Sequence, residues 1–158
     1  MPTFKSLNDI ERYIQEKIND VLVNEVAEDI AFVESEVIID NVYSKYNPEM
    51  YDRRGLGGGF ADPGNIEGTL VADGELVVEN VTPFNPGYET ANSGSGLAGL
   101  IEYGDGYQGH TYDYYPKNKP ATYAEPRPFM EDTRDIVKRG LKHTIATALE
   151  DRGLEVKI

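Results

Sequence analysis

Few residues of this chain have the types and spacing that catalysis usually requires. Its 158 residues include no cysteine, which excludes a thiolate nucleophile, a disulfide framework and cysteine-ligated zinc or iron–sulfur sites. Of the two histidines, His110 lies in a glycine-rich segment and His143 in a predicted helix. Neither belongs to an HExxH motif or to a known nucleophile arrangement. Both are therefore interpreted as surface or interface residues.

Four carboxylates, Glu102, Asp105, Asp113 and Glu125, lie in one loop-rich stretch and are of the type that calcium and magnesium prefer. Their spacing fits no EF-hand loop, and some clustering is expected in a chain with 28 acidic residues. The glycine run at 55–59 is not followed by the GK[ST] of a phosphate-binding loop. We therefore expect no enzymatic activity, no metal and no cofactor.

The first element expected from the sequence is a long amphipathic helix from about Ser6 to Val42. Ser6 or Asn8 is a suitable N-cap. The β-branched residues after Val33 predict a break near Ser35 or Asn41. The apolar residues recur every three or four positions, as one helix face requires: Ile10, Ile14, Ile18, Val21, Leu22, Val26, Ile30, Val33 and Val37.

Residues 43–127 are rich in Gly, Pro, Tyr, Asn and Asp, which predicts short strands joined by long loops. The β-prone runs 66–71 and 75–81 flank Asp73-Gly74, a strong hairpin signal because the turn requires positive φ. The apolar run 97–103 is either a buried strand or one helical turn. Loops as long as 104–126 are uncommon in a compact monomer and are usually functional or ordered against a partner.

A second helix is predicted from Pro128 to about Gly153. Its apolar stripe consists of Phe129, Ile136, Val137, Leu141, Ile145, Ala148 and Leu149. We expect a single α+β domain over residues 1–158, with the N-terminal helix at 1–42, a small antiparallel sheet with long loops at 43–127, and the C-terminal helix and tail at 128–158 packed on the sheet.

Charge is distributed unevenly along the chain, whose net charge is -13. Residues 1–42 hold three basic side chains against ten acidic ones, a balance of -7. The C-terminal helix is locally basic through Arg134, Lys138, Arg139 and Lys142. This complementarity predicts pairing of the two helices within one subunit or between subunits. The acidic helix is either a solvated face, a surface that faces DNA without binding it, or a site for a basic partner.

Tyrosine is concentrated in the loop-rich segment, where ten of the eleven tyrosines lie. These are Tyr43, Tyr46, Tyr51, Tyr88, Tyr103, Tyr107, Tyr112, Tyr114, Tyr115 and Tyr123. Tyrosine provides large amphipathic contact area and is enriched at protein interfaces. The alternative is that these side chains only cover a thin sheet; we favour the interface.

Several short segments, in this order, resemble the tail-component family of tailed bacteriophages, the small neck proteins that complete the tail or join it to the head. After the long helix come YDRRG at 51–55, Asp62, Asn65-Ile66, the hairpin, LAGLIEYG at 97–104 and EPRPFM at 125–130. The LIEYG segment is similar to that family's (V/I)E(F/Y)G signature, and RPFM to its (R/Q)PF(L/M) start of the last helix. The stretch YNPEMYDRRGLGGGFADPGN departs from the family's usual basic segment with a proline and a Thr-Gly pair.

The resemblance implies a structural virion protein without enzymatic activity. It would form a homo-oligomeric ring of sixfold or twelvefold symmetry around the DNA channel, assembled in the bacterial cytoplasm and located in the neck or tail. Its partners would be itself and other neck, connector, tail-tube or terminator proteins, with DNA passing non-specifically and no membrane contact. An acidic helix lining the channel would let DNA pass at low friction.

The family-like positions also suggest roles for individual residues. Glu102 and Arg127 are expected to pair and to fix the hairpin against the start of the last helix, and Phe129 is expected in the core. Arg53 and Arg54 dock an acidic neighbour or lie in a solvated turn. The interface tyrosines are Tyr103, Tyr107, Tyr112 and Tyr114.

Three rival functions are kept open. The nearest is a tail terminator ring, which caps the tail tube in the same particle. The second is an acidic protein-binding module or a DNA mimic, which should spread its carboxylates regularly and keep its loops short. The third is an unrecognised hydrolase, which would show a bound metal or a carboxylate pair with perturbed pKa values.

Overall fold

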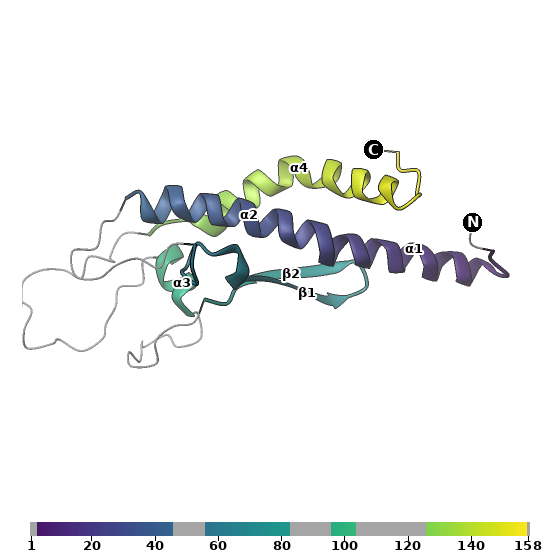
Figure 1. Ribbon diagram of the computed structural model, residues 1–158, viewed down its shortest axis with the longest axis horizontal. Coiled ribbons are helices and arrows are strands. Elements are labelled where there is room, and N and C mark those ends of the chain that lie inside the picture. The colour runs from purple at the N-terminus through teal and green to yellow at the C-terminus, as the bar shows by residue number, and fades with distance from the viewer. Residues whose placement is uncertain (1–2, 46–55, 83–95, 104–125, 158) are drawn as a thin grey trace, which may run out of the picture.

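The computed structural model describes residues 3–45, 56–82, 96–103 and 126–157 (Figure 1). A continuous helix runs from Leu7 to Tyr43. It consists of α1 (Leu7–Val21), a π-helical turn η1 (Leu22–Val26), α2 (Ala27–Ile38) and a second π-helical turn η2 (Ile39–Tyr43). The Ser6 hydroxyl accepts a 3.2 Å hydrogen bond from the amide of Asp9, so the predicted N-cap is confirmed.

Of the two positions predicted for a break, Ser35 is wrong, because the helix continues through it; near Asn41 the α-helix changes to the π-helical turn η2, which ends at Tyr43. The Ser35 side chain is buried, and its hydroxyl donates a 2.6 Å hydrogen bond to the carbonyl of Ala61. Val37, Ile38 and Val42 are buried in the core beyond it. Tertiary burial of these side chains outweighs their intrinsic preference for strands.

The predicted hairpin is present as β1 (Ile66–Ala72) and β2 (Glu75–Asn80), which pair antiparallel. Gly74 has φ +77 at the turn, as the Asp73-Gly74 signal requires. The side chain of Asn19 on α1 holds this turn: its Oδ1 accepts from the Gly74 amide, and its Nδ2 donates to Asp73, each at 2.9 Å. The hairpin tip is therefore fixed to the long helix. A short 3-10 turn, η3 (Pro63–Asn65), precedes β1.

Two more helices complete the described part of the chain. The segment left open between strand and helix forms α3 (Gly96–Tyr103). The C-terminal helix α4 extends over Phe129–Asp151, close to the predicted bounds. It ends where Leu154 donates a backbone hydrogen bond to Leu149, and the Leu154 side chain packs against the cluster to which Leu149 belongs.

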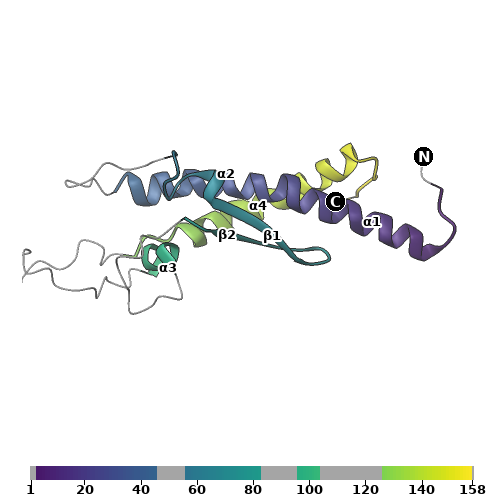
Figure 2. The ribbon, with the colours of Figure 1, turned by 60° about the horizontal axis from the view of Figure 1, so that its bottom comes forward.

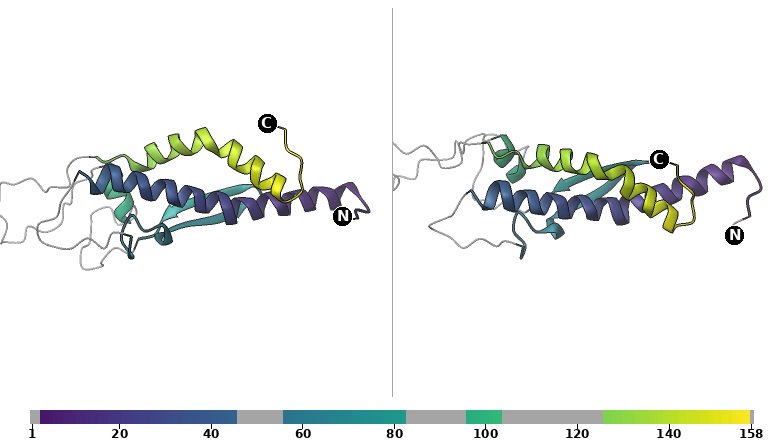
Figure 3. Two further views of the ribbon diagram at one scale, coloured as in Figure 1. Left: turned by 45° about the horizontal axis from the view of Figure 1, so that its top comes forward. Right: turned by 90° about the horizontal axis from the view of Figure 1, so that it is seen from above.

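The α+β fold class is confirmed, but the last helix packs differently from the expected arrangement. In Figure 1, α4 runs along one side of the long helix and the hairpin runs along the other. The contacts of α4 are mainly with α2, and further ones are with α1 and η1. The views of Figures 2 and 3 show the same elongated arrangement. The long helix is therefore the central element, with apolar residues directed toward both neighbours.

The core consists of two buried clusters along the long helix. One joins Val37, Ile38, Val42, Phe60, Ala61 and Phe129, and the other joins Val21, Leu22, Val26, Ala148 and Leu149. Gly68 of β1 lies where a Cβ atom would be 2.4 Å from the Cβ of Ala27, so the hairpin approaches the helix closely there. Among the described residues, no helix combines the length and the apolar character that a membrane span needs.

The acidic long helix and α4 are joined by an ion-pair cluster at the C-terminal end of α4. Arg152 pairs with Asp20 at 2.6 Å and with Glu25 of η1. The hydrogen bond and the positive charge of Arg152 stabilise the ionised carboxylate of Asp20, which lowers its pKa. The four basic residues highlighted in the sequence, Arg134, Lys138, Arg139 and Lys142, are instead exposed.

Candidate functional site

The site with the most polar chemistry lies where α3 meets the start of α4. Glu102 of α3 is 7% exposed, and its carboxylate faces the first turn of α4. Its Oε2 accepts hydrogen bonds from the amides of Phe129 at 2.7 Å and Met130 at 2.9 Å, and its Oε1 accepts one from Glu131 at 3.3 Å. These are among the amides that a helix start leaves without an intrahelical partner. Glu102 therefore caps α4 from a distant segment.

The local sequence explains why the cap comes from elsewhere. Pro128 is the N-cap residue of α4 and has no side-chain acceptor. A carboxylate at this position also interacts favourably with the positive end of the helix dipole. The predicted role of Glu102 was an ion pair with Arg127, and helix capping was missed. A proline at the expected N-cap was the signal in the sequence that an external acceptor is needed.

The backbone of Arg127 is hydrogen-bonded to the residue that precedes Glu102. Its amide donates a 3.0 Å hydrogen bond to the carbonyl of Ile101. The structure thus brings α3 and the start of α4 together, as the expected pairing required, although Glu102 belongs to a helix and not to the hairpin. Pairing of the two charged side chains stays a prediction.

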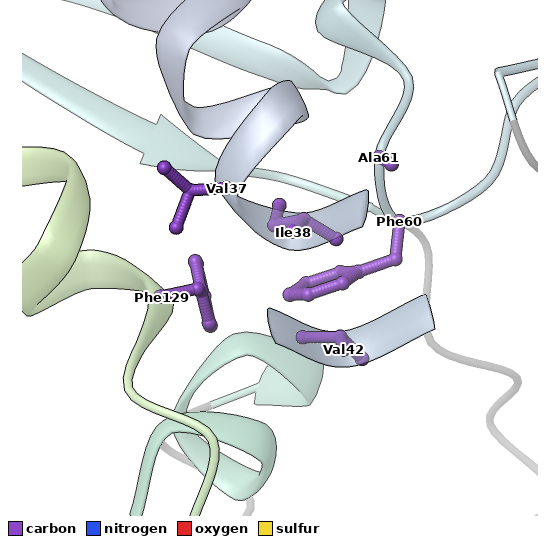
Figure 4. Packing of buried hydrophobic residues seen from close by; sticks show 6 residues of the cluster. All are labelled: Val37, Ile38, Val42, Phe60, Ala61 and Phe129. Carbon is purple, nitrogen blue, oxygen red and sulfur yellow. The ribbon is translucent and has the colours of Figure 1, made fainter. Parts of the chain in front are cut away.

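Phe129 is fully buried and anchors α4 in the core, as expected (Figure 4). Its ring packs edge-to-face against Phe60, with centroids 5.1 Å apart and an interplanar angle of 84°. Val37, Ile38 and Val42 of the long helix complete this cluster. The capped amide and the buried ring of one residue therefore fix the start of α4 at two points.

Phe60 is positioned by an ordered loop over residues 56–65. The Asp62 carboxylate accepts hydrogen bonds from the amides of Gly58 at 2.5 Å and Gly64 at 2.9 Å, and these bonds lower the pKa of Asp62. Asn65 donates from its side chain to the carbonyl of Gly59 at 2.8 Å. These side chains hold the glycine-rich loop in one conformation against the helix.

A second buried carboxylate lies close to Glu102. Glu34 of α2 is 6% exposed and accepts a 3.3 Å hydrogen bond from the side chain of Asn80. Burial raises the pKa of Glu34, and the negative charge of Glu102 raises it further. Asn80 also donates to the carbonyl of Phe60 at 3.0 Å and accepts from the hydroxyl of Thr82 at 2.6 Å.

Sequence reasoning did not identify Glu34 or Asn80. The available signal was the position of Glu34, which follows Ile30 by four residues and precedes Val37 by three, and so lies on the apolar face of the helix. A carboxylate on that face is either exposed at its edge or buried with partners. Only the arrangement of α2, β2 and α3 shows that it is buried.

The remaining predicted site residues are distributed differently. Arg53, Arg54, Tyr107, Tyr112 and Tyr114 lie outside the described residues. Tyr103 is the last residue of α3. His143 is exposed on α4. Within the described ranges, no group of three or more His, Cys, Asp or Glu side chains is placed to hold a metal ion.

Comparison with known proteins places the chain in a phage context. A curated relative is an SPbeta prophage-derived uncharacterized protein YomN of Bacillus subtilis (strain 168), 26% identical over 108 residues. The alignment covers 66% of this chain and 61% of that protein, so the chain spans about three-fifths of the relative's length. No solved structure matches. These findings indicate a phage-associated protein. The family model described as YomN matches residues 6–152, and the chain therefore belongs to the YomN family.

Proposed function

We propose that this chain is a structural protein of a tailed-bacteriophage neck, which forms a homo-oligomeric ring that joins or completes the tail at the head–tail interface. The phage-derived relative and the order of segments along the chain both support this proposal. The observation that carries this proposal is the exposure of large apolar side chains on the surface of the subunit. An elongated helix with a two-stranded sheet exposes large apolar side chains along its length.

Several of these apolar side chains are more than half exposed. Phe32 is 54% exposed, Leu56 59% and Val71 56%. Two-stranded sheets are marginally stable alone, and both strands of this hairpin are edges within the described residues. Neighbouring subunits in a ring would cover such surfaces and edges.

The charge of the long helix supports a channel that DNA passes through. The acidic side chains of this helix that are exposed are Glu11, Glu16, Asp20, Glu28, Asp29, Glu36 and Asp40. Glu34 is buried, and Asp20 and Glu25 are paired with Arg152. In the proposed ring, the exposed carboxylates of α1 face the channel and repel the DNA backbone.

Deletion of the gene from the phage that encodes it tests this function. The expected result is filled heads and separate tails of normal length, with joining restored when the protein is supplied in trans. Tails of abnormal length would instead identify the alternative, a tail terminator ring. Infectious particles of normal yield and composition would overturn both assignments and favour the acidic protein-binding module.

A further inference from the structure

The outer faces of α2 and α4 are complementary in both charge and apolar content. On α2, Phe32 is 54% exposed, and its neighbours one turn away, Glu28, Asp29 and Glu36, are also exposed. Phe32 borders a shallow hollow of about 280 Å³ between α2 and the start of β1, lined also by Ala27, Ala31, Pro63, Gly64 and Ile66. This surface, called here the Phe32 face, has an apolar centre and an acidic rim.

The outer face of α4 carries basic side chains next to the exposed Asp135, which lies four residues before Arg139 and pairs with Arg134. Arg139 has Ile136 three residues before it, Lys142 three residues after it and His143 four residues after it, so all four share one side of the helix. All four are exposed, and Ile136 is 42% exposed. Gly140 beside them leaves open space, since a Cβ atom there would meet nothing within 4 Å. This surface is called here the Arg139 face.

The two faces do not meet within one subunit. The helices α2 and α4 contact each other through their apolar sides. Among the described residues, Arg152 makes the ion pairs from α4 to the long helix, and Arg134 pairs with Glu131 and Asp135 of its own helix. None of the described ion pairs joins Glu28, Asp29 or Glu36 to α4. The complementary charges are therefore available to a second molecule.

We propose that the Phe32 face of one copy docks on the Arg139 face of the next copy. This proposal rests on the proposed homo-oligomer and names its subunit contact. Ile136 of one subunit enters the hollow beside Phe32, and Arg139 and Lys142 face the acidic rim. Because α4 and the hairpin side of the long helix lie on different sides of the molecule, the contact is heterologous, the type that forms a ring when its rotation closes (Figure 1). It leaves Glu11 and Glu16 of α1 free for the channel.

Disulfide cross-linking tests the contact directly, because the chain contains no cysteine of its own. Full-length Phe32→Cys and Ile136→Cys proteins are mixed at high concentration in about 0.1 M salt and oxidised. The expected product is a mixed dimer that forms several-fold faster than either homodimer. In the control mixture, a Val71→Cys protein replaces the Phe32→Cys protein, since Val71 lies on the hairpin and is 56% exposed.

Charge reversal gives the second arm of the test. Adding Glu28→Lys and Glu36→Lys to the Phe32→Cys protein should suppress cross-linking several-fold. When this variant is mixed with an Ile136→Cys protein that also carries Arg139→Glu and Lys142→Glu, cross-linking should be restored. Increasing the salt to about 1 M should weaken the unmodified pair, since charges are then screened within about 3 Å.

Three results would overturn the proposal. The first is cross-linking no faster than with Val71→Cys, and the second is a predominant homodimer of either cysteine variant. The third is that Arg139→Glu and Lys142→Glu abolish binding of the protein to duplex DNA but leave cross-linking unchanged. That result would assign the Arg139 face to nucleic acid. Because the assay uses purified protein, its failure is separate from failure of the neck function, which the gene deletion measures.

Discussion

The carboxylate of Glu102 accepts a 2.7 Å hydrogen bond from the backbone amide of Phe129, across 27 residues of sequence. With the two further amides that it binds, Glu102 satisfies three donors at the start of α4 and connects α3 to the core. The ring of Phe129 packs in the core cluster with Phe60 and Ile38, so the backbone and the side chain of Phe129 both fix the start of α4. Changes at this junction should therefore affect the whole subunit.

Replacing Glu102 by alanine is expected to reduce the free energy of unfolding by about 2–3 kcal/mol, because three amides at the start of α4, one of them buried, lose a charged acceptor. Glu102→Gln, which keeps one acceptor oxygen, should lose less. Urea unfolding followed by circular dichroism measures the change, since the chain has no tryptophan. Glu150→Ala, at an exposed position of α4, is the control. A loss for Glu102→Ala no larger than that of the control would contradict the capping role.

Replacing Phe129 by alanine is expected to cost about 3–5 kcal/mol, because it leaves a cavity next to Phe60, Val37 and Ile38. The matched control is Met130→Ala, since Met130 is adjacent and 37% exposed. Thermal unfolding of both variants gives the comparison. Equal effects of the two changes would mean that Phe129 is not a core anchor.

Two glycine-to-alanine changes should have opposite effects. Gly68→Ala is expected to cost about 1–3 kcal/mol, because its Cβ would lie 2.4 Å from the Cβ of Ala27 and the hairpin must move away from the helix. Gly140→Ala meets no atom within 4 Å and should stabilise α4 by about 0.5–1 kcal/mol. Both free energies come from urea unfolding. If Gly68→Ala were neutral, the close approach of β1 to the long helix would be wrong.

Two carboxyls with shifted pKa values, those of Glu34 and Asp62, predict opposite dependences of stability on pH. The pKa of Glu34 in the folded protein is raised above its ordinary value of 4.5, so its contribution to stability is present at low pH and is lost as the pH rises through the folded pKa. Glutamine does not ionise, so Glu34→Gln removes this loss of stability at higher pH. The stability of the variant relative to the original protein should therefore be greater at neutral pH than at a pH below 4.5.

Asp62 serves as the counterpart. Its folded pKa is lowered below 3.8, so its contribution is present above that value and is lost as the pH falls. Asp62→Asn should reduce the difference in stability between neutral and acidic pH. Denaturant unfolding across the acidic range measures both variants. A Glu34→Gln effect that does not change with pH would show that Glu34 titrates normally in the folded state.

Much of the local structure follows from the sequence because its causes are local. The three- and four-residue spacing of apolar side chains from Ile10 to Val37 predicted the long helix, and Ser6 its start. Asp73-Gly74 predicted the hairpin, since the turn needs positive φ at Gly74. The apolar stripe after Pro128 predicted α4 and the burial of Phe129. In each case the sequence pattern that carried the prediction is local.

What only the tertiary structure decided are the relations between distant segments. Helix through Ser35 follows from burial against Phe60 and Phe129, which outweighs the preference of β-branched residues for strands. The buried state of Glu34 depends on Asn80 and Glu102, and the cap of α4 is supplied from α3. The sequence shows an acidic first helix and a locally basic last helix, whereas the structure packs their apolar sides together, joins them through Arg152 and leaves most of their other charged side chains exposed. Spacing along a chain encodes which residues share a face, but which face is covered depends on the free energy of packing the whole subunit.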